Sequence, residues 1–120
     1  MARVLIVDDA AFMRGSLKYI VEMQGHEVVG LGKSGEQAIL LYRELKPDLV
    51  TLDILMGGID GLETLKQIME INKNAKVIMV TALGQEEKQK EAKRFGASGY
   101  IKKPFSSEQI SEEFSRILDN

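Results

Sequence analysis

Short apolar runs alternate with amphipathic stretches along the whole chain. The runs are mostly Val, Ile and Leu and do not alternate with polar residues, which is typical of parallel strands covered by helices on both faces. They predict strands at residues 4–7, 28–31, 49–52, 77–80 and 100–101. The stretches between them and after the last carry apolar residues at helical spacing. Five strands alternating with five helices predict an α/β domain with right-handed crossovers, in which a sheet lies between two helix layers.

Capping and stop residues mark the ends of the predicted helices. Three helices begin after a capping residue that is followed three positions later by Gln or Glu: Ser34, Asp60 and Ser106. Three end near a residue that disfavours helix: Gly25, Pro47 and Gly96. The stretch 85–95 is almost entirely polar or charged, and only Ala92 and Phe95 are apolar. We expect it to form a helix that lies loosely on the sheet and exposes most of its surface.

Composition narrows the class of protein. The chain has 120 residues, a common size for one domain, with 16 basic and 18 acidic residues and a net charge of -2. This balance gives no electrostatic reason to expect binding to nucleic acid or to a membrane. The chain has no cysteine, which excludes disulfides and favours a reducing compartment. With no apolar segment of signal-peptide or membrane-spanning length, we expect a cytoplasmic domain.

Polar side chains follow most of the predicted strands at the point where each strand ends. Asp8 and Asp9 follow the first strand, Asp53 the third, Thr81 the fourth and Lys103 the fifth. Carboxyl ends of parallel strands share one edge of a sheet, where doubly wound folds bind their ligands. If the first and third strands are neighbours, three carboxylates meet there, and two charges ~4 Å apart repel by roughly 4 kcal/mol near a protein surface. The acids must therefore hold protons or share a cation.

The ligands available at this edge are all oxygen atoms. Carboxylates, with a backbone carbonyl near Leu55, favour Mg²⁺, and Mn²⁺ is the next choice. Zinc is disfavoured because the chain has no cysteine and its single histidine, His26, lies far from the acids in sequence. His26 follows Gly25 in a polar turn, where we expect it to be exposed. For Asp8 and Asp9 alone, a solvated first helical turn is an alternative interpretation, since acids there interact favourably with the helix dipole.

Asp53 is the candidate nucleophile. It follows an apolar strand, which fixes its carboxylate, and a glycine-rich loop comes next. A carboxylate beside a metal can attack phosphorus and form an acyl phosphate. Lys103 can pair with one phosphoryl oxygen and Thr81 can donate a hydrogen bond to another. Taken singly, Thr81 is as well explained as an ordinary strand residue and Lys103 as a surface lysine, so the hypothesis depends on their joint position.

Four motifs occur in order along the chain: "VLIVDD", "LVTLDILMGGIDG", "VIMVTALG" and "YIKKPF". In this order they resemble the signatures of receiver domains of bacterial two-component response regulators, and "DDAAFMR" is most similar to stand-alone regulators of the CheY type. The resemblance implies a flavodoxin-like, doubly wound (βα)5 fold with a parallel sheet of order 2-1-3-4-5. It also implies one receiver domain over residues 1–120 without an output domain. The implied function is a phosphorylation-activated signalling switch, most similar to those of chemotaxis, and not an enzyme with turnover.

The resemblance assigns roles around the acidic edge. Asp53 would accept a phosphoryl group from a phosphohistidine on a sensor histidine kinase. Asp9 would bind Mg²⁺ directly and Asp8 more through water. Asp53 would share the same ion, and the carbonyl of Leu55 would complete the protein ligands.

Further roles concern the switch. Lys103 would contact the phosphoryl group, next to a Lys103-Pro104 peptide that is typically cis in this family. Thr81 and Tyr100 would form a switch pair, in which the hydroxyl moves toward the phosphoryl oxygens and the ring turns inward. The downstream protein would bind the face formed by helix 85–95, strand 99–102 and helix 106–118. The resemblance leaves open a monomer or a phosphorylation-dependent dimer.

Two features distinguish this chain within the family. Receivers usually have proline where this chain has Gly57, so we expect a more mobile loop after Asp53. Leu55 and Leu83 flank the expected phosphoryl position, and two leucines there should hinder an attacking water. We therefore expect a comparatively long-lived acyl phosphate.

Other functions fit part of the pattern. The same receiver could serve as a phosphorelay intermediate or a phosphate sink of another two-component pathway. A metal-dependent phosphatase with an aspartyl nucleophile would use the same pocket, but it generally needs a second acid near the nucleophile, where this chain has Leu55. A flavin site would need backbone amides and hydroxyls around phosphate, which Asp8 and Asp9 would repel.

Overall fold

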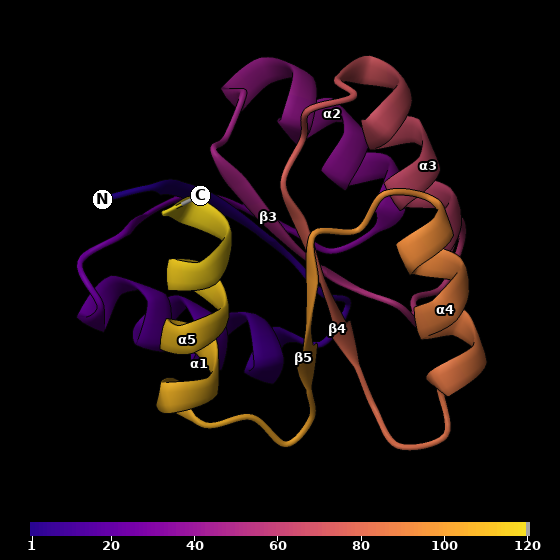
Figure 1. Ribbon diagram of the computed structural model, residues 1–120. Coiled ribbons are helices and arrows are strands. Elements are labelled where there is room, and N and C mark those ends of the chain that lie inside the picture. Colours follow the sequence, from indigo (N-terminus) through magenta and orange to yellow (C-terminus); the bar gives the residue numbers. More distant parts are fainter. Residues whose placement is uncertain (120) are drawn as a thin grey trace.

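The computed structural model, described over residues 1–119, is a parallel five-stranded sheet between two helix layers (Figure 1). The strand order is β2-β1-β3-β4-β5, which confirms the predicted doubly wound fold. The elements are β1 (Arg3–Val7), α1 (Ala11–Met23), β2 (Glu27–Gly32), α2 (Gly35–Leu45), β3 (Leu49–Asp53), α3 (Gly61–Ile71), β4 (Val77–Thr81), α4 (Glu86–Arg94), β5 (Gly99–Lys102) and α5 (Ser107–Leu118).

The sheet separates two hydrophobic cores. Alternate residues of β1 serve them: Leu5 and Val7 point to the core under α2, α3 and α4, whereas Val4 and Ile6 point to the core under α1 and α5. Strands β3 and β4 are buried along their whole length. Burial on both faces explains why these strands are mostly apolar in sequence.

Helix caps largely follow the predicted pattern. Ser106 and Gln109 form a reciprocal capping box at α5, and the Asp60 side chain caps α3. At α2 the Ser34 hydroxyl accepts from the Gln37 N–H, but the Gln37 side chain accepts from the Lys33 N–H instead of the Ser34 N–H, so this box is not reciprocal. These three caps set where α2, α3 and α5 begin relative to the sheet edge.

The expectation that His26 is exposed is wrong. It is half-buried, its Nδ1 accepts a hydrogen bond from the Ala2 N–H at 3.0 Å, and its ring packs on Phe114 of α5 with centroids 5.4 Å apart. Burial, together with the positive N-terminus, lowers the pKa of His26. The residue therefore ties the start of the chain to α5.

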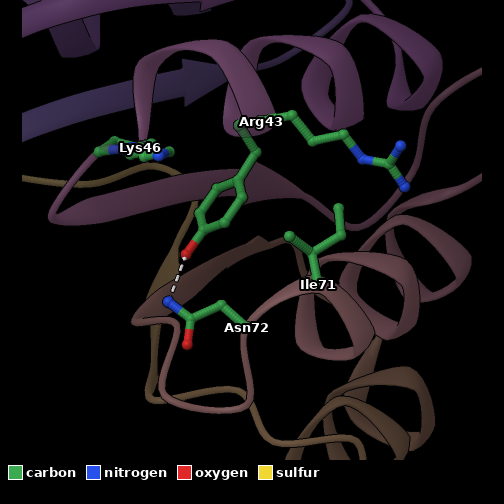
Figure 2. Close-up of a pocket in the computed structure, with 6 residues that line it drawn as sticks. Arg43, Lys46, Ile71 and Asn72 are labelled. Atoms are coloured by element: carbon green, nitrogen blue, oxygen red, sulfur yellow. Dashed lines mark hydrogen bonds between the residues drawn. The ribbon is translucent and has the colours of Figure 1, made fainter.

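A cavity of about 550 Å³ lies between the C-terminal ends of α2 and α3 (Figure 2). Tyr42 lies beside it, and its hydroxyl accepts from the Asn72 amide at 3.2 Å. Arg43 and Lys46 bring positive charge to its rim. These residues precede β3 and β4, so the cavity lies at the amino end of the strands, away from the acidic edge.

The first turn of α3 lies directly against the end of β3. Gly61 donates its N–H to the Ile54 carbonyl at 3.0 Å, and a Cβ at Gly61 would collide with the backbone of Asp53 and Ile54. Only glycine allows this approach, which fixes the backbone that carries the candidate nucleophile. Gly57, in the loop between them, has open space around it.

Gly61→Ala is expected to lower the free energy of unfolding by about 2–3 kcal/mol, because backbone cannot move away from the added methyl group as a flexible side chain would. The matched control Gly57→Ala should leave stability unchanged or raise it by up to about 1 kcal/mol. Urea denaturation of both variants measures the difference, and equal midpoints would contradict the close approach at Gly61.

Candidate functional site

The site lies at the carboxyl edge of the sheet, where β1 and β3 are direct neighbours. Asp8 follows β1 and Asp53 ends β3, and both are buried, whereas Asp9 is exposed. Each of the three offers a carboxylate oxygen within 4.8 Å of the others. The predicted convergence of the three acids is therefore confirmed.

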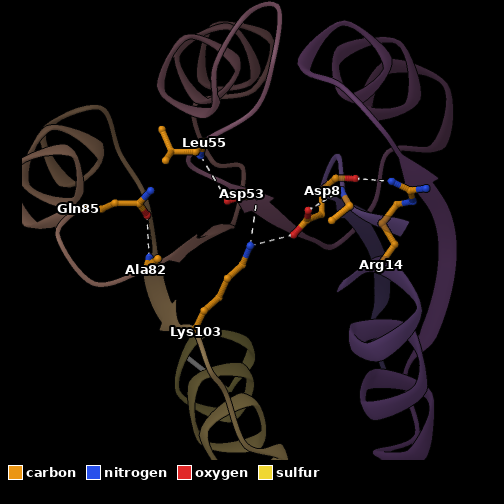
Figure 3. A network of polar contacts seen from close by, with 8 residues as sticks. Asp8, Arg14, Asp53, Leu55, Ala82, Gln85 and Lys103 are labelled. Atoms are coloured by element: carbon orange, nitrogen blue, oxygen red, sulfur yellow. Dashed lines mark hydrogen bonds and ion pairs between the residues drawn. The ribbon is translucent and has the colours of Figure 1, made fainter. Parts of the chain in front are cut away.

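Lys103 reaches this cluster from the end of β5 (Figure 3). Its Nζ lies 3.4 Å from Asp8 Oδ2 and 3.5 Å from Asp53 Oδ2, between the two carboxylates. Its backbone N–H donates to the Thr81 carbonyl at 2.7 Å, which ties it to the end of β4. The Lys103-Pro104 peptide is cis, as the resemblance implied. One ammonium group thus faces two buried carboxylates.

Backbone and side-chain donors orient the two buried acids. Asp8 Oδ1 accepts from the Ala10 N–H at 2.9 Å, and the Asp8 carbonyl accepts from Arg14 Nη1 at 2.7 Å. Asp53 Oδ1 accepts from the Leu55 N–H at 3.3 Å. Sequence reasoning missed Arg14, although its place at the end of "DDAAFMR", five residues after Asp9, was a usable signal. The role of the Leu55 carbonyl as a metal ligand stays a prediction.

Electrostatics at this edge favour binding of a cation. Burial, and next the neighbouring charge of Asp8, raise the pKa of Asp53 from 3.8 to about 6, although Lys103 and the Leu55 N–H oppose the shift. Within the described residues, Asp8 Oδ2 accepts no hydrogen bond and has only the ion contact with Lys103. An all-oxygen cluster with buried, partly unpaired charge fits a hard divalent ion such as Mg²⁺.

The predicted switch residues lie next to this cluster in the sheet. Thr81 directly follows Val80, the β4 residue paired with Asp53, and is 1% exposed. Its hydroxyl has no hydrogen-bond partner among residues 1–119, and the same holds for the buried hydroxyl of Tyr100. The next N–H along the chain, that of Ala82, donates to the Gln85 side chain at 2.7 Å (Figure 3).

Residues 4–115 match the response regulator receiver domain. The chain belongs to this family. The receiver is 46% identical to the chemotaxis protein CheY of Thermotoga maritima over 115 residues, covering 96% of each chain. It is 44% identical to CheY of Bacillus subtilis, covering 98% of each. Among solved structures, a CheX-CheY-BeF3-Mg²⁺ complex from Borrelia burgdorferi matches with a TM-score of 0.92 and 36% identity, covering 97% of this chain and 88% of that one.

The face that we expect to bind the downstream protein is formed by α4, β5 and α5 and is called the output face below. One of its helices, α4, is loosely held. In α4 only Ala92 is fully buried, and Phe95, just beyond the helix, is half-buried with Lys66 Nζ 5.1 Å from its ring centre. A groove of about 350 Å³ lies between α4 and β5, lined by Glu86, Gln89, Lys90, Lys93, Tyr100 and Lys102. The sparse anchoring agrees with the prediction from the sequence.

No helix in the described part of the receiver is long and apolar enough to cross a membrane. Within the same residues, the only cluster of acidic or other metal-ligating side chains is that of Asp8, Asp9 and Asp53. Among the described residues, the side chains placed to share one metal ion therefore lie at this edge.

Asp53→Asn is expected to raise the free energy of unfolding at pH 7 in EDTA by up to about 3 kcal/mol, at about 1.4 kcal/mol per pKa unit. The raised pKa of Asp53 means that the folded state disfavours the charged form. The ionised Asp53 of the wild type therefore lowers the free energy of unfolding by its full amount above about pH 6. This effect disappears as the pH falls toward 3.8. The stability gain of the variant should shrink over the same range.

Chemical denaturation at several pH values measures this gain, with the exposed Asp119→Asn as control. Magnesium should then stabilise the wild type more than Asp53→Asn. A variant less stable than the wild type at pH 7 in EDTA would contradict the electrostatic argument.

Proposed function

We propose that this receiver is a phosphorylation-activated switch that takes a phosphoryl group from a sensor histidine kinase onto Asp53. The observation that carries the proposal is the meeting of Asp8, Asp9, Asp53 and Lys103 at one edge of the sheet, with Asp53 fixed at the end of a fully buried strand. This arrangement holds a carboxylate nucleophile beside a cation site and a positive side chain.

In the proposed transfer, an oxygen of Asp53 attacks the phosphorus of a phosphohistidine. The new P–O bond forms an acyl phosphate while the P–N bond breaks, and the imidazole nitrogen keeps the electron pair and takes a proton. Lys103, already 3.5 Å from Asp53, would move to pair with a phosphoryl oxygen. Mg²⁺ would be held by Asp9 directly, by Asp8 through water, by Asp53 and by the Leu55 carbonyl. It would supply charge that offsets the repulsion between the carboxylate and the phosphoryl group. Manganese would be an alternative ion at the same ligands.

The phosphoryl group then changes the balance between two conformations. Thr81 has a buried hydroxyl without a partner in the described chain, so it can donate to a phosphoryl oxygen at no cost of a broken hydrogen bond. Its movement would leave space beside the half-buried ring of Tyr100, whose hydroxyl is already buried without a hydrogen-bond partner in the described chain, so that the ring can turn further inward. The downstream protein would read this change on α4, β5 and α5.

Chemotaxis is the pathway that the relatives support. The chain matches chemotaxis proteins named CheY over almost their whole length, and one matching structure holds CheY with CheX, BeF3 and Mg²⁺. The lysines at 90, 93 and 102 in the groove beside α4 would favour a target segment that carries acidic residues.

Incubation with a small acyl phosphate and Mg²⁺ is expected to add the mass of one phosphoryl group to the chain, as measured by intact-mass spectrometry. The adduct should be absent in EDTA and in Asp53→Asn, because the first lacks the cation and the second lacks the nucleophile. Asp119→Asn, which changes an exposed acid outside the site, should be modified like the wild type. An unmodified wild type, or steady hydrolysis of a phosphomonoester, would contradict the proposal.

The lifetime of the acyl phosphate tests the two leucines at the site. Leu55 is 52% exposed and Leu83 is 91% exposed, so both are free to cover a phosphoryl group on Asp53. Replacing both with Ser should speed the loss of the phosphoryl group several-fold, because water then approaches phosphorus more easily. Leu40→Ser, at an exposed position of α2, is the control. An unchanged decay rate in the double variant would rule out shielding by these side chains.

A further inference from the structure

Two side chains of α5 cover the side of β5 that β4 leaves free. The Tyr100 N–H donates to Glu113 Oε2 at 2.8 Å, and the Ser98 carbonyl accepts from Arg116 Nη2 at 3.0 Å. Arg116 also pairs with Glu113 through two hydrogen bonds, Nε–Oε1 at 3.1 Å and Nη2–Oε2 at 3.0 Å. Glu113, Arg116 and the backbone of β5 thus form one connected set, which we call the edge clamp.

The packing around the edge clamp is tight. A Cβ at Gly99 would collide with the Glu113 carboxylate and would lie 2.7 Å from Arg116 Nη2. Burial raises the pKa of Glu113, but the hydrogen bonds from Arg116 and from the Tyr100 N–H outweigh it, so the net shift is downward. Glu113 therefore stays ionised at neutral pH, and charge-assisted hydrogen bonds are the stronger kind.

The two helices of the output face are held very differently. Helix α5 buries Ile110, Phe114 and Ile117 and is joined to β5 by the edge clamp, whereas α4 has a single fully buried residue, Ala92. A helix with few buried contacts opens or shifts at lower free energy than one with many.

We infer that Glu113 and Arg116 are positioning residues, which fix the backbone of β5 at Tyr100 to α5. The Tyr100 ring then changes its rotamer within a fixed strand, so β5 and α5 form the stationary half of the output face and α4 the responsive half. This inference rests on the proposed function, because it assigns the positioning of the switch residue in that mechanism.

The edge clamp also limits how a partner can bind. The Tyr100 N–H and the Ser98 carbonyl already have partners, so they are not free to pair with an added strand. We therefore expect a target to recognise side chains of α4, β5 and α5, such as those that line the groove beside α4.

Amide hydrogen exchange of the unmodified protein, followed by NMR, tests the edge clamp. In Glu113→Ala the Tyr100 amide should exchange about tenfold faster or more, because a hydrogen bond to a charged group is lost. Glu112→Ala is the matched control, since Glu112 is an exposed acid one position earlier, and should exchange like the wild type. Glu113→Gln keeps an acceptor oxygen and should restore most of the protection. Equal Tyr100 exchange in Glu113→Ala and Glu112→Ala would overturn the inference.

The same measurement after phosphorylation tests the division of the output face. In the wild type, exchange across α4 should change while the Tyr100 amide and α5 stay within about twofold of their unmodified values, because the clamp hydrogen bonds persist. In Glu113→Ala the change should extend into β5 and α5. Loss of protection at Tyr100 and α5 in the wild type, as large as that in α4, would overturn the inference. Intact mass separates the two proposals: a chain without the adduct contradicts the phosphoacceptor function, while the unmodified variants still decide whether the clamp positions Tyr100.

Discussion

The attraction between Lys103 and the buried carboxylates of Asp8 and Asp53 is the interaction on which the site depends. One ammonium group lies between two acids, and a third acid, Asp9, lies at the solvent side of the same cluster. The ammonium charge is too small to balance all three, so the site keeps a net negative charge that a divalent cation can offset. The strand order produces this arrangement, because it makes β1 and β3 neighbours and brings their ends to one edge.

Hydrophobic periodicity and capping residues predicted the strands and helix ends, because these depend on residues close together in the sequence. Burial on both faces makes β3 and β4 mostly apolar, apart from Thr51 and the strand-end residues Asp53 and Thr81, so both strands were readable from the sequence. The Ser106 capping box needs only residues three positions apart. The acidic cluster followed from the rule that the ends of parallel strands share an edge. The roles implied for Leu55 and Tyr100 came from the family resemblance, since nothing in their local sequence indicates them.

Contacts between distant parts of the chain could not be predicted in this way. His26 reads as a turn residue, but its partners Ala2 and Phe114 come from opposite ends of the chain. Glu113 and Arg116 look like an ordinary exposed pair on a helix, and only the packing of α5 against β5 shows that they hold a strand backbone. Both cases involve polar side chains whose partners are set by tertiary packing, which hydrophobic periodicity does not encode.

The weak anchoring of α4 has a consequence for signal gain. If thermal fluctuation alone places α4 in the target-binding conformation in about one chain in ten, full activation can tighten target binding by no more than about tenfold. Each additional buried contact under α4 would lower this resting fraction and widen the ratio between the active and silent states, at the expense of a harder transition. With one fully buried alanine, α4 can change conformation readily, but the same weak anchoring raises the fraction of unmodified protein that binds the target.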